Sequence, residues 1–434
     1  MTDRSKKKTI SRRSLLKGAA GVAGFAAGSG TLLSAPYVHA ADAKVLRYLG
    51  TAVNEGDEIS KKCLADTGIK IEYITATTDD VTKRVITQPN SFDVLDTEYF
   101  SLKKLVPSGN IFPLDARKIK EFDNITPVFT KGELPNGKKI GGQGTAPWKV
   151  LYLEGANSKT FSATPTEFVT LIPTVYNADT LGIRPDLIKR PISSWAELLN
   201  PEFKGKASIL NIPSIGIMDA ALVVEATGQY KYADKGNMTK AEIDLTMKVL
   251  TEAKKAGQFR AFWKDFNESV NLMASGETVI QSMWSPAVAA VRVKEIPCVY
   301  APVNIKNGKE GYRGWCNGMG LMKHLTGKKL DAAYEYLNWY LSGWQGGFVA
   351  RYGYYSPVPS TAKKFLTAAE WEFWYEGKPA PEIVNDPYGV PMEKAGTKRD
   401  GGSFLDRVTN ISCWNTLMDE AAYMNKRWND FKVA

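Results

Sequence analysis

Hydrophobic and polar positions follow two different spacings along the first part of the chain. Val45–Leu49 and Phe92–Leu95 are short apolar runs, and apolar residues alternate with charged ones over Ile69–Tyr73, which is the spacing of strands. Gly56–Asp66 and Asp79–Thr87 instead carry apolar residues at helical spacing. The order strand, helix, strand, helix, strand predicts a parallel sheet with crossover helices.

A polar segment directly follows the third predicted strand. Asp96, Thr97, Glu98 and Tyr99 come after Phe92–Leu95, and we expect them to form a loop at the carboxyl end of that strand. Open parallel sheets bind ligands at this end. Asp96, Thr97 and Tyr99 are therefore candidate ligand-binding residues.

A second set of strand and helix patterns begins near residue 190. Ser194–Glu197 and Thr239–Glu242 have the form of capping boxes that open helices. Lys206–Leu210 and Val279–Met283 are predicted strands, and Lys329–Leu341 has the apolar stripe of a helix. Since the chain of 434 residues exceeds one typical domain and shows two such sets, we expect two α/β lobes.

The first forty residues have the pattern of an export signal. A basic head is followed by an Ala/Gly-rich uncharged run from Gly18 to Ala35 and by the small-residue site Val38–Ala40. Arg12 and Arg13 lie within Ser-Arg-Arg-Ser-Leu-Leu-Lys, which resembles the twin-arginine signal. We therefore predict a signal peptide over 1–40 and a periplasmic protein. An ordinary secretory signal and a membrane anchor are the alternatives.

Removing this segment changes the charge of the protein. The full chain has a net charge of +10, and because 1–40 holds seven basic residues and one acid, the mature chain is near +4. Basic and acidic residues are intermixed, which does not favour a nucleic-acid partner. His324 is the one histidine left, and there is no Cys-x-x-Cys pair, so we expect no metal or cofactor.

Four cysteines remain in the mature chain: Cys63, Cys298, Cys316 and Cys413. An oxidising compartment permits disulfides, and Cys298 with Cys316 is the best pair. We favour buried free thiols.

The motifs of common enzymes are missing from the sequence. It contains no Gly-x-Ser-x-Gly elbow and no phosphate-binding loop with its lysine. Asp93 with Asp96 is a carboxylate pair, but it has no partner base or metal ligand nearby in sequence. We therefore assign no catalytic residue and expect the protein not to be an enzyme.

Several segments in order resemble one known family. These are Tyr176–Asp179, Pro191–Lys206, Ser275–Glu277 with Trp284, and Ser356–Pro359. They are similar to the type II extracellular solute-binding proteins of ABC importers, and most similar to the spermidine/putrescine-binding branch. The resemblance covers most of the mature chain.

The resemblance implies a two-lobe periplasmic-binding-protein fold. Each lobe would be a mostly parallel sheet flanked by helices, joined by hinge strands. Lobe 1 would comprise 44–172 and about 315–355, and lobe 2 would comprise 173–314 and about 356–434. Hinge closure would trap a small-molecule solute and present it to an inner-membrane permease. We expect a monomer, and the alternative is a periplasmic enzyme exported by the twin-arginine route.

The residues leave two kinds of ligand open. The resemblance places Tyr99, Trp284 and Trp315 at aromatic positions of a polyamine site, but Asn317 stands where the branch has Asp. The Ile212–Gly216 loop carries no acid, and Ser214 could cap the following helix and leave N–H groups for an anion. The resemblance implies a polyamine, whereas the residues favour a zwitterion or small carboxylate seated at Ser214, so from the residues we expect spermidine and putrescine to bind poorly. Arg313 is a further anion partner or a solvated charge.

Overall fold

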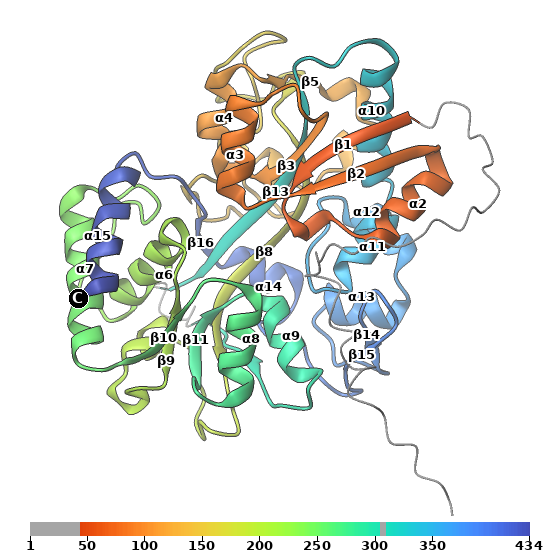
Figure 1. Ribbon diagram of the computed structural model, residues 1–434. Helices are drawn as coiled ribbons and strands as arrows, with labels where there is room; N and C mark the ends of the chain where they lie inside the picture. The colour runs from red at the N-terminus through yellow and green to blue at the C-terminus, as the bar shows by residue number, and fades with distance from the viewer. Residues whose placement is uncertain (1–43, 304–309) are drawn as a thin grey trace, which may run out of the picture.

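The computed structural model describes residues 44–303 and 310–434. Figure 1 shows two α/β lobes with strands running between them. The predicted signal over 1–40, with Arg12 and Arg13, lies outside the described residues. No helix in these two ranges is long and apolar enough to cross a membrane.

Lobe 1 is built on three parallel strands. β1 (Lys44–Gly50) lies between β2 (Ile69–Thr75) and β3 (Val94–Glu98). The lobe's helices are α2 (Asp57–Thr67), α3 (Thr78–Thr87), α4 (Leu102–Ser108), α10 (Gly327–Leu341) and α11 (Trp344–Ala350). The strand–helix alternation predicted for residues 45–95 is thus present.

Lobe 2 repeats this arrangement. β9 (Ala207–Leu210) lies between β10 (Phe259–Trp263) and β11 (Ile280–Met283), and all three are parallel. Its helices are α6 (Pro213–Ala226), α7 (Lys240–Lys255), α8 (Phe266–Ser275), α9 (Ser285–Arg292) and α15 (Ala421–Val433). The C-terminal helix α15 packs against α6 and α7.

Two long strands connect the lobes. β8 (Ile172–Ile183) and β13 (Tyr312–Met322) pair with each other in antiparallel register. β8 also pairs with β11 of lobe 2, and β13 pairs with β3 of lobe 1, both antiparallel. The strands therefore form one continuous sheet through both lobes, and the lobe boundaries given above remain a prediction.

Shorter elements complete the two lobes. A C-terminal segment lies beside both lobes, with α12 (Pro359–Ala362), α13 (Ala368–Trp374), β14 (Val384–Asn385), β15 (Pro391–Glu393) and α14 (Phe404–Thr409). β16 (Ile411–Trp414) then pairs with the start of β13. The remaining short elements are β4 (Ile111–Phe112), β5 (Leu114–Asp115), α5 (Pro127–Thr130), β6 (Gln143–Gly144), β7 (Phe168–Val169) and β12 (Val299–Tyr300).

Helix starts follow the predicted capping chemistry in one case and depart from it in another. At α7 the Thr239 side chain and Glu242 form the predicted capping box. Ser194 instead opens a short 3-10 helix, and its hydroxyl accepts from the N–H of Ala196. The Glu197 carboxylate binds Arg190 at 2.6 Å, so it is not free to complete a box.

The loop predicted after Phe92–Leu95 is wrong. β3 continues to Glu98, and Thr97 and Glu98 pair with Gly318 and Asn317 on β13. The antiparallel partner β13 comes from more than two hundred residues further along the chain. Because this long-range pairing satisfies the backbone of a polar segment, local composition indicates a loop where the fold forms a strand.

Candidate functional site

The carboxyl ends of the parallel strands in the two lobes face each other. Glu98 at the end of β3 pairs with Asn317 near the middle of β13. Met283 at the end of β11 pairs with Thr180, which lies towards the middle of β8. Residues that follow β3 and β11 are therefore brought to the junction between the lobes, where open α/β sheets place their ligands.

Asp96 and Asn317 lie on the lobe 1 side of this junction. Asp96 is fully buried, and its Oδ2 accepts from Tyr48 at 2.9 Å and from Asn54 at 2.7 Å. Burial raises the pKa of Asp96 to about 7, although these hydrogen bonds oppose the rise. Asn317 is also buried and donates to Thr51 Oγ1 at 3.2 Å.

Thr97 and Tyr99 are interior residues of lobe 1. Thr97 is fully buried and donates to the hydroxyl of Ser101 at 3.2 Å. Tyr99 is 1% exposed, and its ring lies 5.9 Å from that of Phe129. Both side chains therefore help to pack the lobe, and Tyr99 also contributes to the pocket described next.

Glu98 and Trp315 line one narrow pocket at the junction. Its wall comes from β3, β13 and β16 and from the residues that follow β3 and β16, and it includes Tyr99, Trp414 and Asn415. Asn415 donates to the Glu98 carboxylate at 2.7 Å, and burial raises the pKa of Glu98 to about 7. The Nε1 atom of Trp315 is buried without a hydrogen-bond partner, and its ring lies edge-on to Tyr354 at 5.5 Å.

Trp284 and Ser214 lie at the strand ends of lobe 2. Trp284 precedes α9, is partly buried, and meets Trp263 edge-on at 4.9 Å. Ser214 is the second residue of α6, and no side chain caps that helix. The cap predicted for Ser214 is therefore wrong, because the helix already begins at Pro213 and Ile212 takes the capping position.

The start of α6 offers few free donors for an anion. Pro213 has no N–H, and the N–H groups of Ile215 and Gly216 both donate to Ile212 O, at 3.0 and 2.7 Å. Ser214 is the one residue of this turn whose N–H has no recorded acceptor in the described part of the chain. A carboxylate would find little of the usual helix N-terminal site here.

Arg313 is not a solvated charge. It lies on β13, is 1% exposed, and binds Asp219 at 2.6 Å and Asp179 at 3.3 Å. A third donor reaches Asn415 at 2.9 Å. Burial raises the pKa of Asp179 and of Asp219 despite the attraction of Arg313.

These contacts leave the junction with an excess of acid. Among the described residues, Arg313 binds Asp179 and Asp219 and also acts on Glu98 through space. Arg407 acts on Asp179 as well, so these three acids meet two cations. Sequence reasoning missed Asp179 and Asp219 as charges of this site, and it missed Asn415 altogether. Asp179 is the last residue of the family-like segment Tyr176–Asp179. Its place in that segment was the one feature of the sequence that could have identified it.

The remaining candidate groups, Asp93 and the four cysteines, lie in contacts that hold the fold together. Asp93 is paired with Arg47 at 2.7 Å and with Lys329 at 2.8 Å, and His324 lies 3.4 Å away. The four cysteines are buried and unpaired within the described ranges. In 44–303 and 310–434 no group of three His, Cys, Asp or Glu side chains could hold a metal ion.

Comparison with models of protein families identifies a family of binding proteins, which agrees with two lobes that meet at a junction. The family model described as bacterial extracellular solute-binding protein matches residues 58–373. This match spans more than half of the chain, so the protein belongs to that family. The resemblance to extracellular solute-binding proteins inferred from the sequence motifs is therefore confirmed, and the spermidine/putrescine branch stays a prediction.

Individual relatives are distant. The spermidine/putrescine-binding periplasmic proteins of Escherichia coli K12 and Shigella flexneri are each 22% identical over 327 residues, which cover 74% of this chain and 76% of the relative. A spermidine/putrescine ABC transporter substrate-binding protein from Streptococcus pneumoniae has a TM-score of 0.60 at 14% identity, covering 90% and 99% of the two chains.

A second similar structure is named for a different ligand. The Atu4243-GABA receptor has a TM-score of 0.56 at 16% identity and covers 89% of this chain and 97% of its own. At these identities the structural likeness establishes the fold alone. The two-lobe periplasmic-binding-protein fold predicted from the sequence is thus confirmed.

Proposed function

We propose that this protein is the solute-binding component of an ABC importer and that its solute carries at least one ammonium group. The Glu98 carboxylate is the observation that carries this proposal. It lies in a pocket beside the Trp315 ring, and its recorded side-chain partner is the neutral amide of Asn415. A bound cation would supply the missing charge.

The chemistry of this pocket suits an amine. A carboxylate forms short charge-assisted hydrogen bonds with an ammonium group, and an indole face attracts the same cation. The acid excess from Asp179 and Asp219 over Arg313 acts in the same direction. The names of the distant relatives that bind spermidine and putrescine support this class of solute.

A polyamine is favoured over a carboxylate at Ser214. The sequence suggested that the acids of a polyamine site were lost, since Asn317 and the Ile212–Gly216 loop carry no charge. Glu98, Asp179 and Asp219 are acids in other positions that could replace them. The start of α6, in contrast, has lost most of its free donors to Ile212 O.

The proposed mechanism is capture by hinge bending about β8 and β13. Solute would bridge the two lobes, and the closed form would deliver it to an inner-membrane permease from the periplasm. We propose a monomer that performs no covalent chemistry. Small-angle scattering with and without saturating solute tests closure through the radius of gyration.

Calorimetric titration tests the ligand class directly. Spermidine, putrescine, 4-aminobutyrate and succinate represent polyamines, a zwitterion and a dicarboxylate. We expect the two polyamines to bind most tightly and succinate not to bind. Succinate binding more tightly than every amine would overturn the proposal, whereas a preference for 4-aminobutyrate would keep the amine and replace the polyamine.

The variant Glu98→Gln removes the charge with little change of shape. Loss of a charge-assisted hydrogen bond costs about 1.5–3 kcal/mol, so amine affinity should fall by about tenfold to a hundredfold. Glu252→Gln, on the exposed face of α7, is the matched control. Equal affinity of Glu98→Gln and the wild type would exclude Glu98 from the site.

A further inference from the structure

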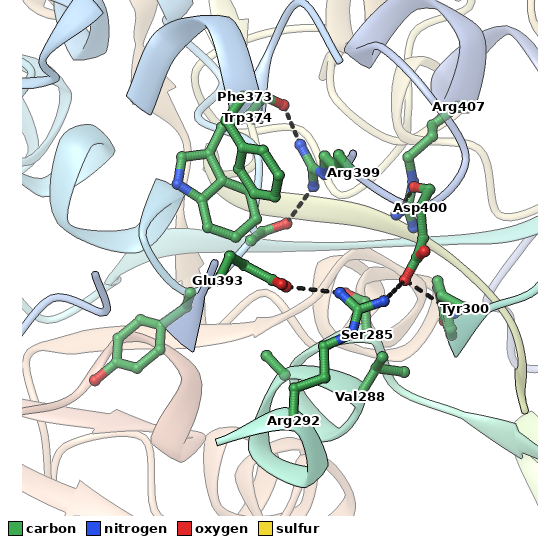
Figure 2. Close-up of a pocket in the computed structure, with 13 residues that line it drawn as sticks. Ser285, Val288, Arg292, Tyr300, Phe373, Trp374, Glu393, Arg399, Asp400 and Arg407 are labelled. Atoms are coloured by element: carbon green, nitrogen blue, oxygen red, sulfur yellow. Dashed lines mark hydrogen bonds and ion pairs between the residues drawn. The ribbon is translucent and has the colours of Figure 1, made fainter. Parts of the chain in front are cut away.

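A second cavity lies beside β8, away from the Glu98 pocket. Its volume is about 40 Å³, and it is lined by α9 of lobe 2 on one side and by residues between 352 and 407 on the other. It shares no lining residue with the Glu98 pocket. Figure 2 shows three arginines and two acids around it: Arg292, Arg399, Arg407, Glu393 and Asp400.

One arginine, Arg292, forms ion pairs with both acids of the cavity. Arg292 binds Glu393 at 2.6 Å and Asp400 at 2.5 Å, and Figure 2 shows its guanidinium reaching between them. The same Asp400 oxygen also accepts from the N–H of Tyr300 at 2.9 Å. Both carboxylates are therefore already paired with a cation.

Arg399 has no carboxylate partner among the described residues. It is 7% exposed and donates to two main-chain carbonyls, Trp374 O and, at 2.7 Å, Gly353 O. Its guanidinium lies over the rings of Tyr355 and Trp374. Burial and the neighbouring Arg407 lower the pKa of Arg399 to about 10.

Arg407 adds a second cation with an unused donor. It is 2% exposed and donates to Ala178 O and to Asp400 O, both uncharged carbonyl groups. Its Nε atom is buried and has no hydrogen-bond partner in the part of the chain that the structure describes. The next acid beyond the cavity is Asp179, which is already bound by Arg313 and by Tyr300.

We propose that this cavity binds one small inorganic anion, such as chloride, between Arg399 and Arg407. The wall combines an excess of one positive charge with a free donor, and burying an unpaired charge is costly. A volume of about 40 Å³ exceeds the 10–15 Å³ or so that one water needs, but it is far too small for a polyamine. The anion would hold the C-terminal segment against α9.

Two measurements test this site. In the first, the thermal unfolding midpoint is followed while gluconate, which is too large for the cavity, is replaced by chloride at constant ionic strength. Binding to the folded state should give a saturable rise of about 2–4 °C. In the second, crystals are grown in bromide, and an anomalous peak is expected between Arg399 and Arg407.

Matched variants separate the site from general salt effects. Arg399→Met removes the charge and should abolish the response to chloride. Arg117→Met, which removes an exposed arginine paired with Asp115, should keep it. If Arg399→Met does not fold, the bromide peak in the wild type decides. An empty or water-filled cavity in bromide, or an equal chloride response in both variants, would overturn the proposal.

Discussion

Arg313 and Asp219 form a buried ion pair in which Nε lies 2.6 Å from Oδ1 and neither side chain is more than 2% exposed. Arg313 belongs to the crossing strand β13, and Asp219 belongs to the first half of α6 in lobe 2. Asp179 on β8 binds the same guanidinium at 3.3 Å. One arginine thus ties both crossing strands to lobe 2.

Removing this arginine should destabilise the protein strongly. Arg313→Met would leave Asp219 buried without its cation and would remove one of the two cations that act on Asp179. Breaking a buried pair in this way typically costs about 3–5 kcal/mol. Urea denaturation measures the free energy of unfolding. Arg190→Met breaks a more exposed pair with Glu197 and should cost less than about 1 kcal/mol. Similar losses in both variants would contradict a structural role for the Arg313 pair.

Local sequence patterns predicted several helices and short strands, because capping and the spacing of apolar residues depend on residues close together in the chain. The helix α7 has its predicted capping box, and its apolar residues Ile243, Met247 and Leu250 are buried. The short strands β1, β2 and β9 were also placed correctly. The long strand β8 was missed, because its burial comes from neighbours distant in sequence.

The candidate site was harder to predict for the same reason. The pocket joins Glu98 on β3, Trp315 on β13 and Asn415 directly after β16, which are far apart along the chain. Arg313 was read as a solvated charge, since the two acids that bury it lie 94 and 134 residues away. Sequence spacing carries no information about such pairs without the register of β8 and β13.

The buried carboxyl of Asp96 should make stability depend on pH. Burial raises its pKa from 3.8 to about 7, so the folded protein keeps a proton that the unfolded chain releases at a lower pH. The stabilising contribution of Asp96 is therefore complete below about pH 4 and is lost as the pH rises to 7. The amide of Asp96→Asn does not ionise, so this variant does not lose stability through position 96 as the pH rises. From pH 5 to pH 8 its stability relative to the wild type should therefore increase.

Urea denaturation at both pH values measures this difference. Glu252→Gln, an exposed substitution on α7, should differ from the wild type by the same amount at pH 5 and pH 8. A constant difference for Asp96→Asn as well would mean that Asp96 is ionised in the folded protein throughout this range.

Trp284 and Trp315 should contribute to solute affinity more than to folding. Both are partly buried at the junction, so truncation of either to Ala should weaken binding by about 1–3 kcal/mol. Trp263 is the contrast, because it is 1% exposed and donates to Ser282 O at 3.0 Å. Trp263→Ala should cost about 3–5 kcal/mol of stability. Calorimetry and urea denaturation separate the two effects, and unfolding of Trp284→Ala would make Trp284 a core residue.

The export route predicted from the sequence can be tested separately. Replacing Arg12 and Arg13 with Lys keeps the charge but changes the residue pair that marks the twin-arginine signal. The precursor should then accumulate inside the cell, as cell fractionation and immunoblotting would show. Arg4→Lys makes the same change outside the motif and should leave export intact. Unchanged export of the double variant would exclude this route but not the periplasm.

Glu98 should couple solute affinity to pH. Its pKa is raised to about 7 by burial, whereas alkyl ammonium groups such as that of Lys titrate near 10.4. From pH 6 to pH 8 the solute therefore keeps its charge while Glu98 loses its proton. Because only the ionised carboxylate pairs with an ammonium group, spermidine affinity should rise by about tenfold over this range.

Calorimetry at the two pH values, in buffers of different ionisation enthalpy, measures both the affinity and the proton released on binding. At pH 6 the wild type should release close to one proton, since the cation favours the ionised form of Glu98. Glu98→Gln has no such proton, so its affinity should be lower and the same at both pH values. If the wild type bound spermidine without pH dependence or proton release, the ammonium group would have to lie away from Glu98, nearer to Asp179 and Asp219.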